Sequence, residues 1–550
     1  MKEVPSGIDD FRTLVKGGYY YVDKTALLDR VLSSEGKVFI FTRPRRFGKS
    51  LNLSMIDAYL NMDYADESAE WFDGLDISRI RPDDPARGAY PVIRLNLQGL
   101  LVGTHRTFVR TLAKRMSELF ARFSEVRGSL DERDRRIFDK VYFNRADEAD
   151  LSDALLFLTR VVMEHHGRKV VLLIDEYDNP INNSYGTRGQ KENLDLIKSI
   201  FNNGLKSNDN LAFAVVTGIM RIAKESIFSG LNNLVVDNIF SVESGESFGF
   251  TEDEVRIICD SYGHPERFDE AKQWYDGYRF GKSDIYNPWS ILAYVERGFE
   301  PSDYWSGTSG NAIIDDLLSR ALAKTCLDLT RIGDRETVSV GLDERVTFSD
   351  ISSGTTALYA VMVMSGYLKA VPEGGRSYTV SVPNLEMNSV FARHILASMS
   401  ADLPNLASPV IASVLNGDTA GIEANLRRFM ETYDFKTLGK EHTYQVMLGC
   451  MFATSCFTHR VVFEGMSGDG YYDLLLVRTG GTDPNILIEF KALRGRAERE
   501  RLESEAAKAL AQIHGKRYAE GMEDVILYGM AFRGKSVAVV MDDTMRRARF

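Results

Sequence analysis

One segment near the amino terminus constrains the fold more than any other. The apolar run Val38–Thr42 leads into residues 43–50, RPRRFGKS, and the amphipathic segment Leu51–Leu60 follows. A continuous apolar run of this length is typical of a parallel strand buried on both faces. A strand that passes through Gly-Lys-Ser into a helix is the setting of a phosphate-binding loop. The segment therefore predicts an α/β domain with a phosphate site at the end of this strand.

The last three residues of the loop explain how it would hold a nucleotide. Gly48 lets the backbone N–H groups turn toward the phosphates, and Lys49 places its ammonium beside the β- and γ-phosphates. Ser50 offers an oxygen to Mg²⁺, and the helix that follows adds the partial positive charge of its N-terminus. These residues predict ATP and Mg²⁺ as cofactors.

The start of the loop departs from the usual pattern GxxxxGK[ST]. Arg43 occupies the position of the first glycine, and Pro44 removes one backbone N–H donor. The arginines after Pro44 could bind phosphate instead, through charge-assisted hydrogen bonds. The alternative is that Gly-Lys-Ser only begins a helix after a solvated basic turn. The predicted nucleotide-binding residues of the loop are Arg43, Arg45, Arg46, Phe47, Gly48, Lys49 and Ser50.

A second apolar run supports the nucleotide site. Residues Val170–Ile174 end in Asp175 and Glu176, and an apolar strand that ends in two acids is typical of a Walker B motif. The first acid would hold Mg²⁺, and the second would polarise the attacking water. By itself the pattern also fits a buried strand that ends at a helix cap. Because the Gly-Lys-Ser loop precedes it, we interpret Asp175 as a metal ligand and Glu176 as a catalytic base.

Two further runs complete the expected sheet. Leu211–Val216 ends at Thr217, where related ATPases place a γ-phosphate sensor, and Arg221 follows four residues later. The alternative for this pair is a strand end and a surface arginine. Residues 91–96 could form a fourth strand. Because helical segments separate these runs, the first half of the chain is predicted to form a doubly wound α/β domain.

The carboxyl-terminal part carries a second set of charged residues. Asp473 lies in the apolar run Tyr471–Val477, and Glu489 and Lys491 lie in the run Asn485–Lys491. With a period of two, Glu489 and Lys491 face the same side of their strand. The intervening Gly-Gly-Thr-Asp-Pro is a turn sequence, so a hairpin would bring Asp473 to Glu489. We predict phosphodiester hydrolysis, in which the carboxylates bind Mg²⁺ and the lysine orients the attacking water.

Flanking helices extend this cluster. Glu441, on a predicted helix at 441–451, is a candidate third metal ligand, and Gln512 and Tyr518 lie on a predicted helix at 499–518. The alternative is a surface hairpin with a salt bridge at its lysine. The order of an acid-bearing helix, two acid-bearing strands and a glutamine-bearing helix favours a nuclease site. The predicted metal ligands of the two sites are Ser50, Asp175, Glu441, Asp473 and Glu489.

Length and composition bound the remaining interpretations. A chain of 550 residues is long enough for three or four domains. We expect a P-loop domain at 1–250, a helical lid or linker at 251–345, a mixed segment at 346–425 and a nuclease-like domain at 426–550. The net charge of −11 argues against coating of nucleic acid by bulk attraction, but it is compatible with a local basic groove. Four cysteines without a CxxC pair fit a reducing cytosol, the first residues contain no apolar run typical of a secretory signal, and no apolar run is long enough for a membrane span. We therefore expect a cytoplasmic protein without membrane contact.

Several stretches together resemble a known family, the bacterial and archaeal AAA-ATPase-like proteins with a C-terminal PD-(D/E)XK nuclease domain. In this sequence the stretches are PSGIDDF at 5–11, YVDKT at 21–25, RPRRFGKSLNLSM at 43–55, LIDEYDNPI at 173–181, TGIMRIAKESIFSGLNN at 217–233, WYDGYRFG at 274–281, YNPWS at 286–290, YYDLLLV at 471–477 and IEFKA at 488–492. The family pattern also carries the arginine at position 43. One departure is visible: after Glu441 the family commonly has Tyr-His, whereas this chain has Tyr444-Gln445.

The resemblance implies an AAA-type P-loop domain, a helical lid and a restriction-endonuclease-like domain. It implies an ATP-binding, Mg²⁺-dependent nuclease, with DNA favoured over RNA as partner, an oligomer formed through the AAA-type domain, and a setting in genome defence or mobile-element control. The alternative is a nucleotide-switched, nucleic-acid-binding or signalling ATPase that does not cut. The complete set of Asp473, Glu489 and Lys491 favours the enzyme.

Overall fold

The chain forms two compact units, seen here in a computed structural model. Unit 1 comprises residues 1–317 and 337–390, and unit 2 comprises 318–336 and 391–550. The chain therefore passes from unit 1 to unit 2 and back before it returns to unit 2, which differs from the predicted division at 250, 345 and 425. The structure describes residues 2–545 except 221–232, 306–311, 320–322, 334, 345–354, 392–402, 433–443, 446, 450, 453–455, 457, 464–465, 480–481 and 494–497.

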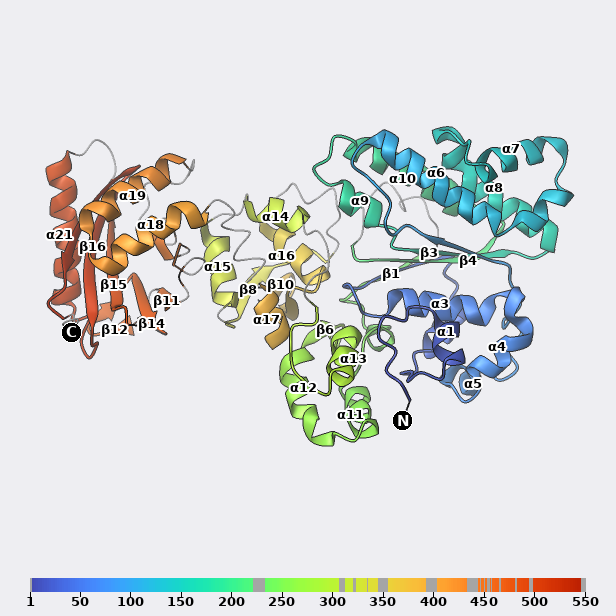
Figure 1. Cartoon of the computed structure of the whole chain (residues 1–550), viewed down its shortest axis with the longest axis horizontal. Coiled ribbons are helices and arrows are strands. Elements are labelled where there is room, and N and C mark those ends of the chain that lie inside the picture. The colour runs from blue at the N-terminus through green and yellow to red at the C-terminus, as the bar shows by residue number, and fades with distance from the viewer. Residues whose placement is uncertain are drawn as a thin grey trace. The chain divides into compact units, whose positions relative to one another are not determined.

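A five-stranded parallel sheet forms the centre of unit 1 (Figure 1). In spatial order its strands are β2 (Val92–Asn96), β3 (Val170–Asp175), β4 (Leu211–Gly218), β1 (Val38–Thr42) and β5 (Leu234–Asp237). All neighbouring pairs run parallel, and every residue of β1 and β3 is buried. The predicted doubly wound sheet is thus confirmed, and β5 is an addition whose short apolar run gave little signal.

Helices cover both faces of this sheet. The helices of this region are α1 (Phe11–Lys16), α2 (Ala26–Ser33), α3 (Lys49–Leu60), α4 (Ala65–Phe72), α5 (Asp76–Ile80), α6 (His105–Ala121), α7 (Glu132–Tyr142), α8 (Glu148–His166), α9 (Asn179–Ser184) and α10 (Gln190–Leu205). In Figure 1, α1, α3 and α4 lie below the sheet, and α6, α7, α8 and α10 lie above it. Burial on both faces explains why the strands are apolar throughout rather than alternating.

The rest of unit 1 consists of short helices and strands. They are α11 (Glu252–Ser261), α12 (Phe268–Tyr275), β6 (Tyr278–Phe280), β7 (Ser283–Ile285), α13 (Pro288–Glu296), α14 (Ala312–Ser319), β8 (Val338–Gly341), α16 (Thr355–Met364), β9 (Lys369–Gly374), β10 (Ser377–Ser381) and α17 (Leu385–Phe391). The helices α11 to α13 surround a cluster that includes Tyr275, Tyr286 and Tyr294, and Tyr20 and Val22 pack against it. The aromatic segment predicted as a lid therefore packs on the amino-terminal segment of the P-loop domain.

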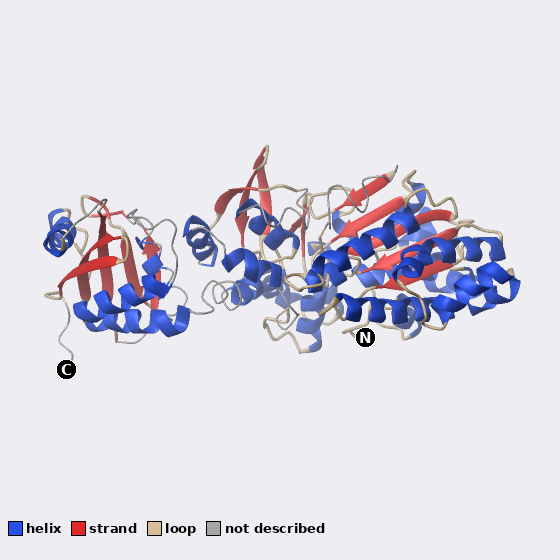
Figure 2. Ribbon diagram, turned by 90° about the horizontal axis from the view of Figure 1, so that it is seen from above, coloured by secondary structure: helices blue, strands red, loops and turns tan. Residues whose placement is uncertain are grey.

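Unit 2 is built on a mixed five-stranded sheet in the order β11-β14-β15-β16-β17, with helices on both sides (Figure 2). Its elements are α15 (Ala323–Gly333), α18 (Leu403–Asn416), α19 (Thr419–Thr432), β11 (His459–Phe463), β12 (Met466–Ser467), β13 (Gly470–Tyr471), β14 (Leu474–Arg478), β15 (Asn485–Ala492), α21 (Arg499–Gly515), β16 (Val525–Arg533) and β17 (Ser536–Asp542). β14 and β15 pair antiparallel, as the turn sequence predicted, and β15 pairs parallel with β16. Among the described helices of both units, none is long and apolar enough to cross a membrane.

Candidate functional sites

The phosphate-binding loop joins β1 to α3, as the motif predicted. Gly48 precedes α3 with φ of 78°, a left-handed conformation that glycine adopts without strain. Lys49 is buried, and its Nζ donates hydrogen bonds to the carbonyl oxygens of Arg43 at 3.0 Å and Pro44 at 2.7 Å. Burial lowers the pKa of Lys49 to about 8, although nearby carboxylates oppose this shift. The ammonium thus lies beneath the loop, close to where phosphates would sit.

The Arg43 side chain does not face the phosphate position. Its guanidinium is fully buried and pairs with Asp237 Oδ1 at 2.7 Å, while Ser244 accepts further hydrogen bonds through its hydroxyl at 3.0 Å and its carbonyl at 3.2 Å. The expectation that this side chain binds nucleotide is therefore wrong. Arg43 instead ties the start of the loop to β5, because Asp237 is the last residue of that strand.

The next residues of the loop contact the aromatic segments 274–281 and 286–290. Arg46, at φ 69°, stacks its guanidinium 4.3 Å above the Trp289 ring and donates to the Tyr304 carbonyl at 2.9 Å. Phe47 is buried against Tyr278 and Phe280. Sequence reasoning separated these aromatic segments from the nucleotide site. Within the sequence, the one feature that could have indicated this contact is the high density of aromatic residues in the two segments.

Arg45 points elsewhere, into a cavity that it lines with Asn182 and Met220. Asn182 lies on α9, which follows β3, and Met220 lies just beyond β4. This arginine therefore faces the space at the carboxyl ends of β3 and β4, which is consistent with its predicted contact to phosphate.

The acids at the end of β3 lie beside Lys49. β4 runs between β1 and β3, so Thr217 at its end reaches Asp175, to which its hydroxyl donates at 2.5 Å. The second oxygen of Asp175, Oδ2, is buried and has no hydrogen-bond partner among the described residues. Burying a carboxylate oxygen without a hydrogen-bond partner costs free energy, unless a cation binds that oxygen. Asp175 therefore fits the predicted role of a Mg²⁺ ligand, with Ser50 half-buried at the start of α3.

Glu176 and Asp178 differ in what their carboxylates can do. Glu176 is partly buried at φ 52°, and burial raises its pKa, an effect that the neighbouring Asp175 reinforces. Asp178 is buried and accepts hydrogen bonds from the backbone N–H groups of Ile219 and Met220, both at 2.9 Å. The Asp178 carboxylate therefore fixes the backbone that directly follows β4. Glu176 consequently remains the better candidate for a general base.

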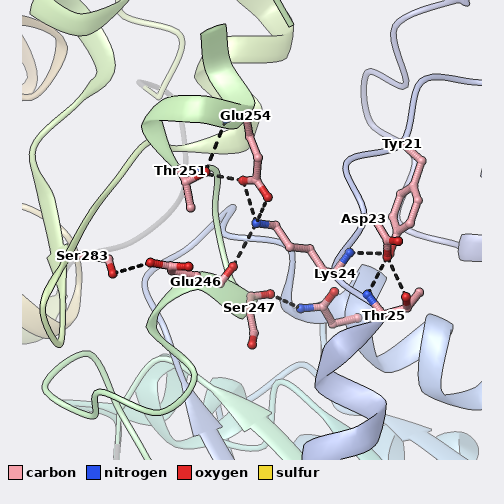
Figure 3. Close-up of polar contacts among 10 residues, drawn as sticks. Tyr21, Asp23, Lys24, Thr25, Glu246, Ser247, Thr251, Glu254 and Ser283 are labelled. Carbon is pink, nitrogen blue, oxygen red and sulfur yellow. Dashed lines mark hydrogen bonds and ion pairs between the residues drawn. The ribbon is translucent and has the colours of Figure 1, made fainter. Parts of the chain in front are cut away.

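A small apolar cavity of about 70 Å³ adjoins Gly48. Tyr20, Val22 and Leu292 contribute to its wall, together with Phe250. Beside it, Lys24 bridges the amino-terminal segment to α11 through hydrogen bonds of 2.6 and 2.7 Å to the Glu254 carboxylate (Figure 3). This cavity is the part of the site that could take a flat apolar group next to the phosphates, and no single motif predicted it.

In unit 2 the predicted carboxylates meet at one edge of the hairpin. The register places Leu474 opposite Ile488, so Asp473 and Glu489 are the next residues along the two strands. Asp473 Oδ2 accepts a hydrogen bond of 2.7 Å from the Phe490 N–H, and Lys491 Nζ lies 3.4 Å from Glu489 Oε1. The Gln512 amide, on α21, also donates to Glu489. The hairpin thus brings together the residues that the sequence pattern selected.

Glu489 has the properties of a metal ligand. It is 2% exposed, and its Oε2 has no hydrogen-bond partner in the described part of the chain. Burial, reinforced by the charge of Asp473, raises the pKa of Glu489 to about 7. A cation would lower the pKa of Glu489 and would bind the oxygen that has no hydrogen-bond partner among the described residues. The residues therefore fit a divalent ion. Asp473 and Glu489 form a pair only, since no cluster of three acids, histidines or cysteines occurs among the described residues.

The remaining predicted residues have different outcomes, and one residue that was not predicted lies beside the site. Glu441 and Arg221 lie outside the described residues. Tyr518 follows the end of α21 and is buried in an apolar cluster with Leu487 and Val525, away from a ligand role. Gln445 is the departure from the family pattern, and its amide donates a 2.5 Å hydrogen bond to the Asp473 carbonyl. That amide consequently stands next to the acidic pair.

Two family models match two separate parts of the chain. Residues 5–228 match the AAA-ATPase-like family, described as predicted AAA-ATPase, and residues 439–541 match the PD-(D/E)XK nuclease superfamily. An uncharacterized protein in the vnfD 5' region of Azotobacter chroococcum mcd 1 is 27% identical over 561 residues, covering 98% of each chain. The ORC2 protein of Aeropyrum pernix, solved as ADPNP–ADP complexes, is 11% identical with a TM-score of 0.32, over 68% of this chain and 92% of that one. The two family matches contain the loop of unit 1 and the carboxylates of unit 2.

Proposed function

Since the chain joins an AAA-ATPase-like domain to a domain of the PD-(D/E)XK nuclease superfamily, we propose that it is an ATP-binding, Mg²⁺-dependent nuclease. The observation that carries this proposal is the meeting of Asp473, Glu489 and Lys491 at one edge of the β14–β15 hairpin. Two carboxylates and one ammonium in this arrangement suit hydrolysis of a phosphodiester, because the substrate and the transition state are both anionic.

Each residue of the nuclease site has a distinct task in this proposal. Asp473 and Glu489 hold the ion, which neutralises the scissile phosphate and lowers the pKa of a bound water when it is present. Lys491 orients the attacking water and offsets the negative charge that develops on the phosphate. Gln512 fixes the rotamer of Glu489 through the hydrogen bond to its Oε1. The free oxygen of Glu489 is thereby left for the metal.

The ATP site is proposed at the carboxyl edge of the sheet in unit 1. Lys49 exchanges its two carbonyl partners for the β- and γ-phosphates, which gain more from a buried positive charge. Asp175 and Ser50 hold Mg²⁺, Glu176 polarises the attacking water, and Thr217 senses the γ-phosphate. The apolar cavity beside Gly48 takes the base.

The test compares four proteins: the wild type, Asp473→Ala, Lys491→Ala and Lys49→Ala. Cutting of single- and double-stranded DNA and RNA is measured with Mg²⁺ and with EDTA, and ATP binding is measured by calorimetry. We expect Asp473→Ala to abolish cutting with ATP binding unchanged, and Lys491→Ala to lose about 10²-fold or more in rate. Lys49→Ala should bind ATP at least tenfold more weakly.

The matched control is Asp469→Ala, because Asp469 is an exposed acid four residues away that pairs with Arg517. It should cut at the wild-type rate. A wild type that cuts none of the substrates would reject the nuclease. Cutting that survives both Asp473→Ala and Lys491→Ala would place the chemistry elsewhere.

A second candidate function is a nucleotide-switched ATPase that binds nucleic acid without cutting it. The observation that favours it is Gln445, whose neutral amide touches the Asp473 carbonyl where the resembled family commonly has histidine. A glutamine amide cannot exchange a proton, whereas an imidazole at this position could act as a general acid or base near neutral pH. Gln445→His separates the two functions: a gain of cutting activity in an inactive wild type would favour the switch.

The setting of the nuclease forms the last part of the proposal. We place it in the cytoplasm, acting on DNA in genome defence or mobile-element control, with assembly through the AAA-type domain. The location follows from the sparse cysteines and the lack of a signal, and the setting and the assembly follow from the family resemblance. They call for cell fractionation, for sedimentation with and without ATP, and for a plaque or plasmid-transfer assay that compares wild type with Asp473→Ala.

A further inference from the structure

A strongly basic segment lies in unit 1, outside both candidate sites. Between His105 and Arg145 the chain has eleven Lys or Arg residues against six Asp or Glu residues, although its overall net charge is −11. The segment forms α6 and α7. Positive charge is thus concentrated on one helical layer of an otherwise acidic protein, and such a distribution marks a candidate surface for polyanions.

On α6 the exposed cations form a row. Arg106, Arg110 and Lys114 are exposed and four residues apart, so they project from the same side of the helix. The opposite side is buried through residues such as Phe108 and Leu112. With a rise of 1.5 Å per residue, the row extends for about 12 Å. We call these three residues the α6 row.

The α6 row is largely free of internal partners. Within the described part of the chain, Arg106 and Arg110 form no salt bridge, and Lys114 approaches Glu118 only at 3.8 Å between exposed side chains. Other acids of the segment are engaged by other arginines, as in the pairs Arg127–Asp139, Arg136–Glu132 and Arg160–Asp134. The row therefore keeps its charge available to an external ligand.

An exposed aromatic ring lies beside the same helix. Phe143 is 50% exposed, and the guanidinium of Arg145 lies 5.6 Å from its ring centre. The Ser117 hydroxyl of α6 donates a 2.6 Å hydrogen bond to the Tyr142 carbonyl, which fixes Phe143 next to the helix. A basic row with a neighbouring exposed ring suits nucleic acid, because phosphates pair with the cations and a base can stack on the ring.

We infer that the α6 row, together with Phe143 and Arg145, is a nucleic-acid-binding surface of the ATPase unit, separate from the nuclease site of unit 2. This inference deepens the proposed function, from which it takes the class of partner. An acidic protein would also pair with the cations, but it has no base that could stack on the Phe143 ring. The AAA-type unit would thus hold DNA or RNA by itself rather than act only as a source of ATP energy.

The experiment measures binding of the full-length protein to fluorescent 30-nucleotide single- and double-stranded DNA in EDTA, where a metal-dependent nuclease cannot cut. The variant is Arg106→Gln/Arg110→Gln/Lys114→Gln. The matched control is Lys37→Gln/Lys169→Gln/Lys206→Gln, which removes three exposed lysines near the amino ends of the parallel strands. Both variants lose the same charge, and both should melt within about 2 °C of wild type, since all six side chains are exposed.

We expect the α6-row variant to bind duplex DNA roughly 100-fold more weakly than the wild type at 0.1 M salt. The slope of the logarithm of its binding constant against the logarithm of the salt concentration should be smaller in magnitude by about 3. The control should keep most of the affinity, and Phe143→Ala should weaken single-stranded DNA more than duplex. Equal losses in the two triple variants, or no wild-type binding at 50 mM salt, would overturn the inference. If the wild type cuts nucleic acid but the α6-row variant binds DNA like the wild type, only this inference fails. If the wild type binds DNA through the α6 row but cuts no substrate, only the proposed nuclease function fails.

Discussion

At the scale of single residues, the burial of Glu489 links metal binding to pH. Burial and Asp473 raise the pKa of Glu489 to about 7, and only the ionised form binds a cation. Apparent Mg²⁺ or Mn²⁺ affinity should therefore fall about tenfold per pH unit below 7. Because the folded-state pKa lies above the unfolded value, ionisation destabilises the metal-free fold as pH rises, fully so above pH 7.

Glu489→Gln checks both consequences. The neutral amide should remove the pH dependence of metal binding by abolishing binding, and should raise the free energy of unfolding at pH 8 without metal. Calorimetric titration with Mn²⁺ and urea unfolding at pH 5.5 and 8 measure the two effects. Metal affinity that is constant from pH 5.5 to 8 in the wild type would contradict the prediction.

Arg43 gives a second prediction at this scale. Arg43→Gly restores the usual glycine of the loop motif, yet it should lower stability rather than improve nucleotide binding. The substitution leaves the buried Asp237 with Arg30 alone, at 2.6 Å, and breaking a buried pair in this way costs about 3–5 kcal/mol. Urea unfolding of Arg43→Gly, with Arg43→Gly/Asp237→Asn as the compensating control, measures the loss. Stability at the wild-type level would show that the pair is dispensable.

At the scale of elements, the close approach of α21 to β16 positions Gln512. A Cβ on Gly529 would lie 2.1 Å from the Ala506 carbonyl oxygen and 2.5 Å from the Leu510 nitrogen, and Gly529 is the register partner of Glu489. Gly529→Ala should therefore push α21 away from the sheet, at a cost of about 1–3 kcal/mol, and should slow cutting by moving Gln512.

The control at this scale is Gly515→Ala, because a Cβ at the end of α21 would meet no atom within 4 Å. Thermal melting and the cutting rate are compared for the two alanine variants. A Gly529→Ala protein that melts and cuts like the wild type would show that a methyl group fits between α21 and β16 without moving the helix.

At the scale of the whole molecule, the order of units along the chain limits how it can be divided. Unit 2 includes α15 from residues 318–336, and Leu329 and Ile332 of that helix are fully buried. A fragment of residues 391–550 lacks α15, so it should melt at a lower temperature than unit 2 does in the intact chain. Calorimetry of the fragment and of the full-length protein measures this difference. An equal melting temperature would mean that α15 adds nothing to unit 2.

Local patterns determined the parts of this protein whose cause is local. The apolar runs predicted β1 to β4, because continuous burial demands apolar residues at every position. The period of two and the turn sequence predicted that Asp473 and Glu489 meet, because a hairpin fixes its own register. These features needed no knowledge of distant residues, and both candidate sites were predicted from them.

Tertiary structure decided what depends on distant partners. The role of Arg43 could not be predicted, because Asp237 lies 194 residues away and only the pairing of β1 with β5 brings it near. The oxygens of Asp175 and Glu489 that have no hydrogen-bond partner among the described residues likewise become apparent only in the packed structure. The amide of Gln445 and the membership of α15 in unit 2 follow from how whole elements pack. The sequence by itself thus determined which groups could do chemistry, and packing decided which atoms remain free to do it, because hydrogen-bond partners are assigned only in the folded chain.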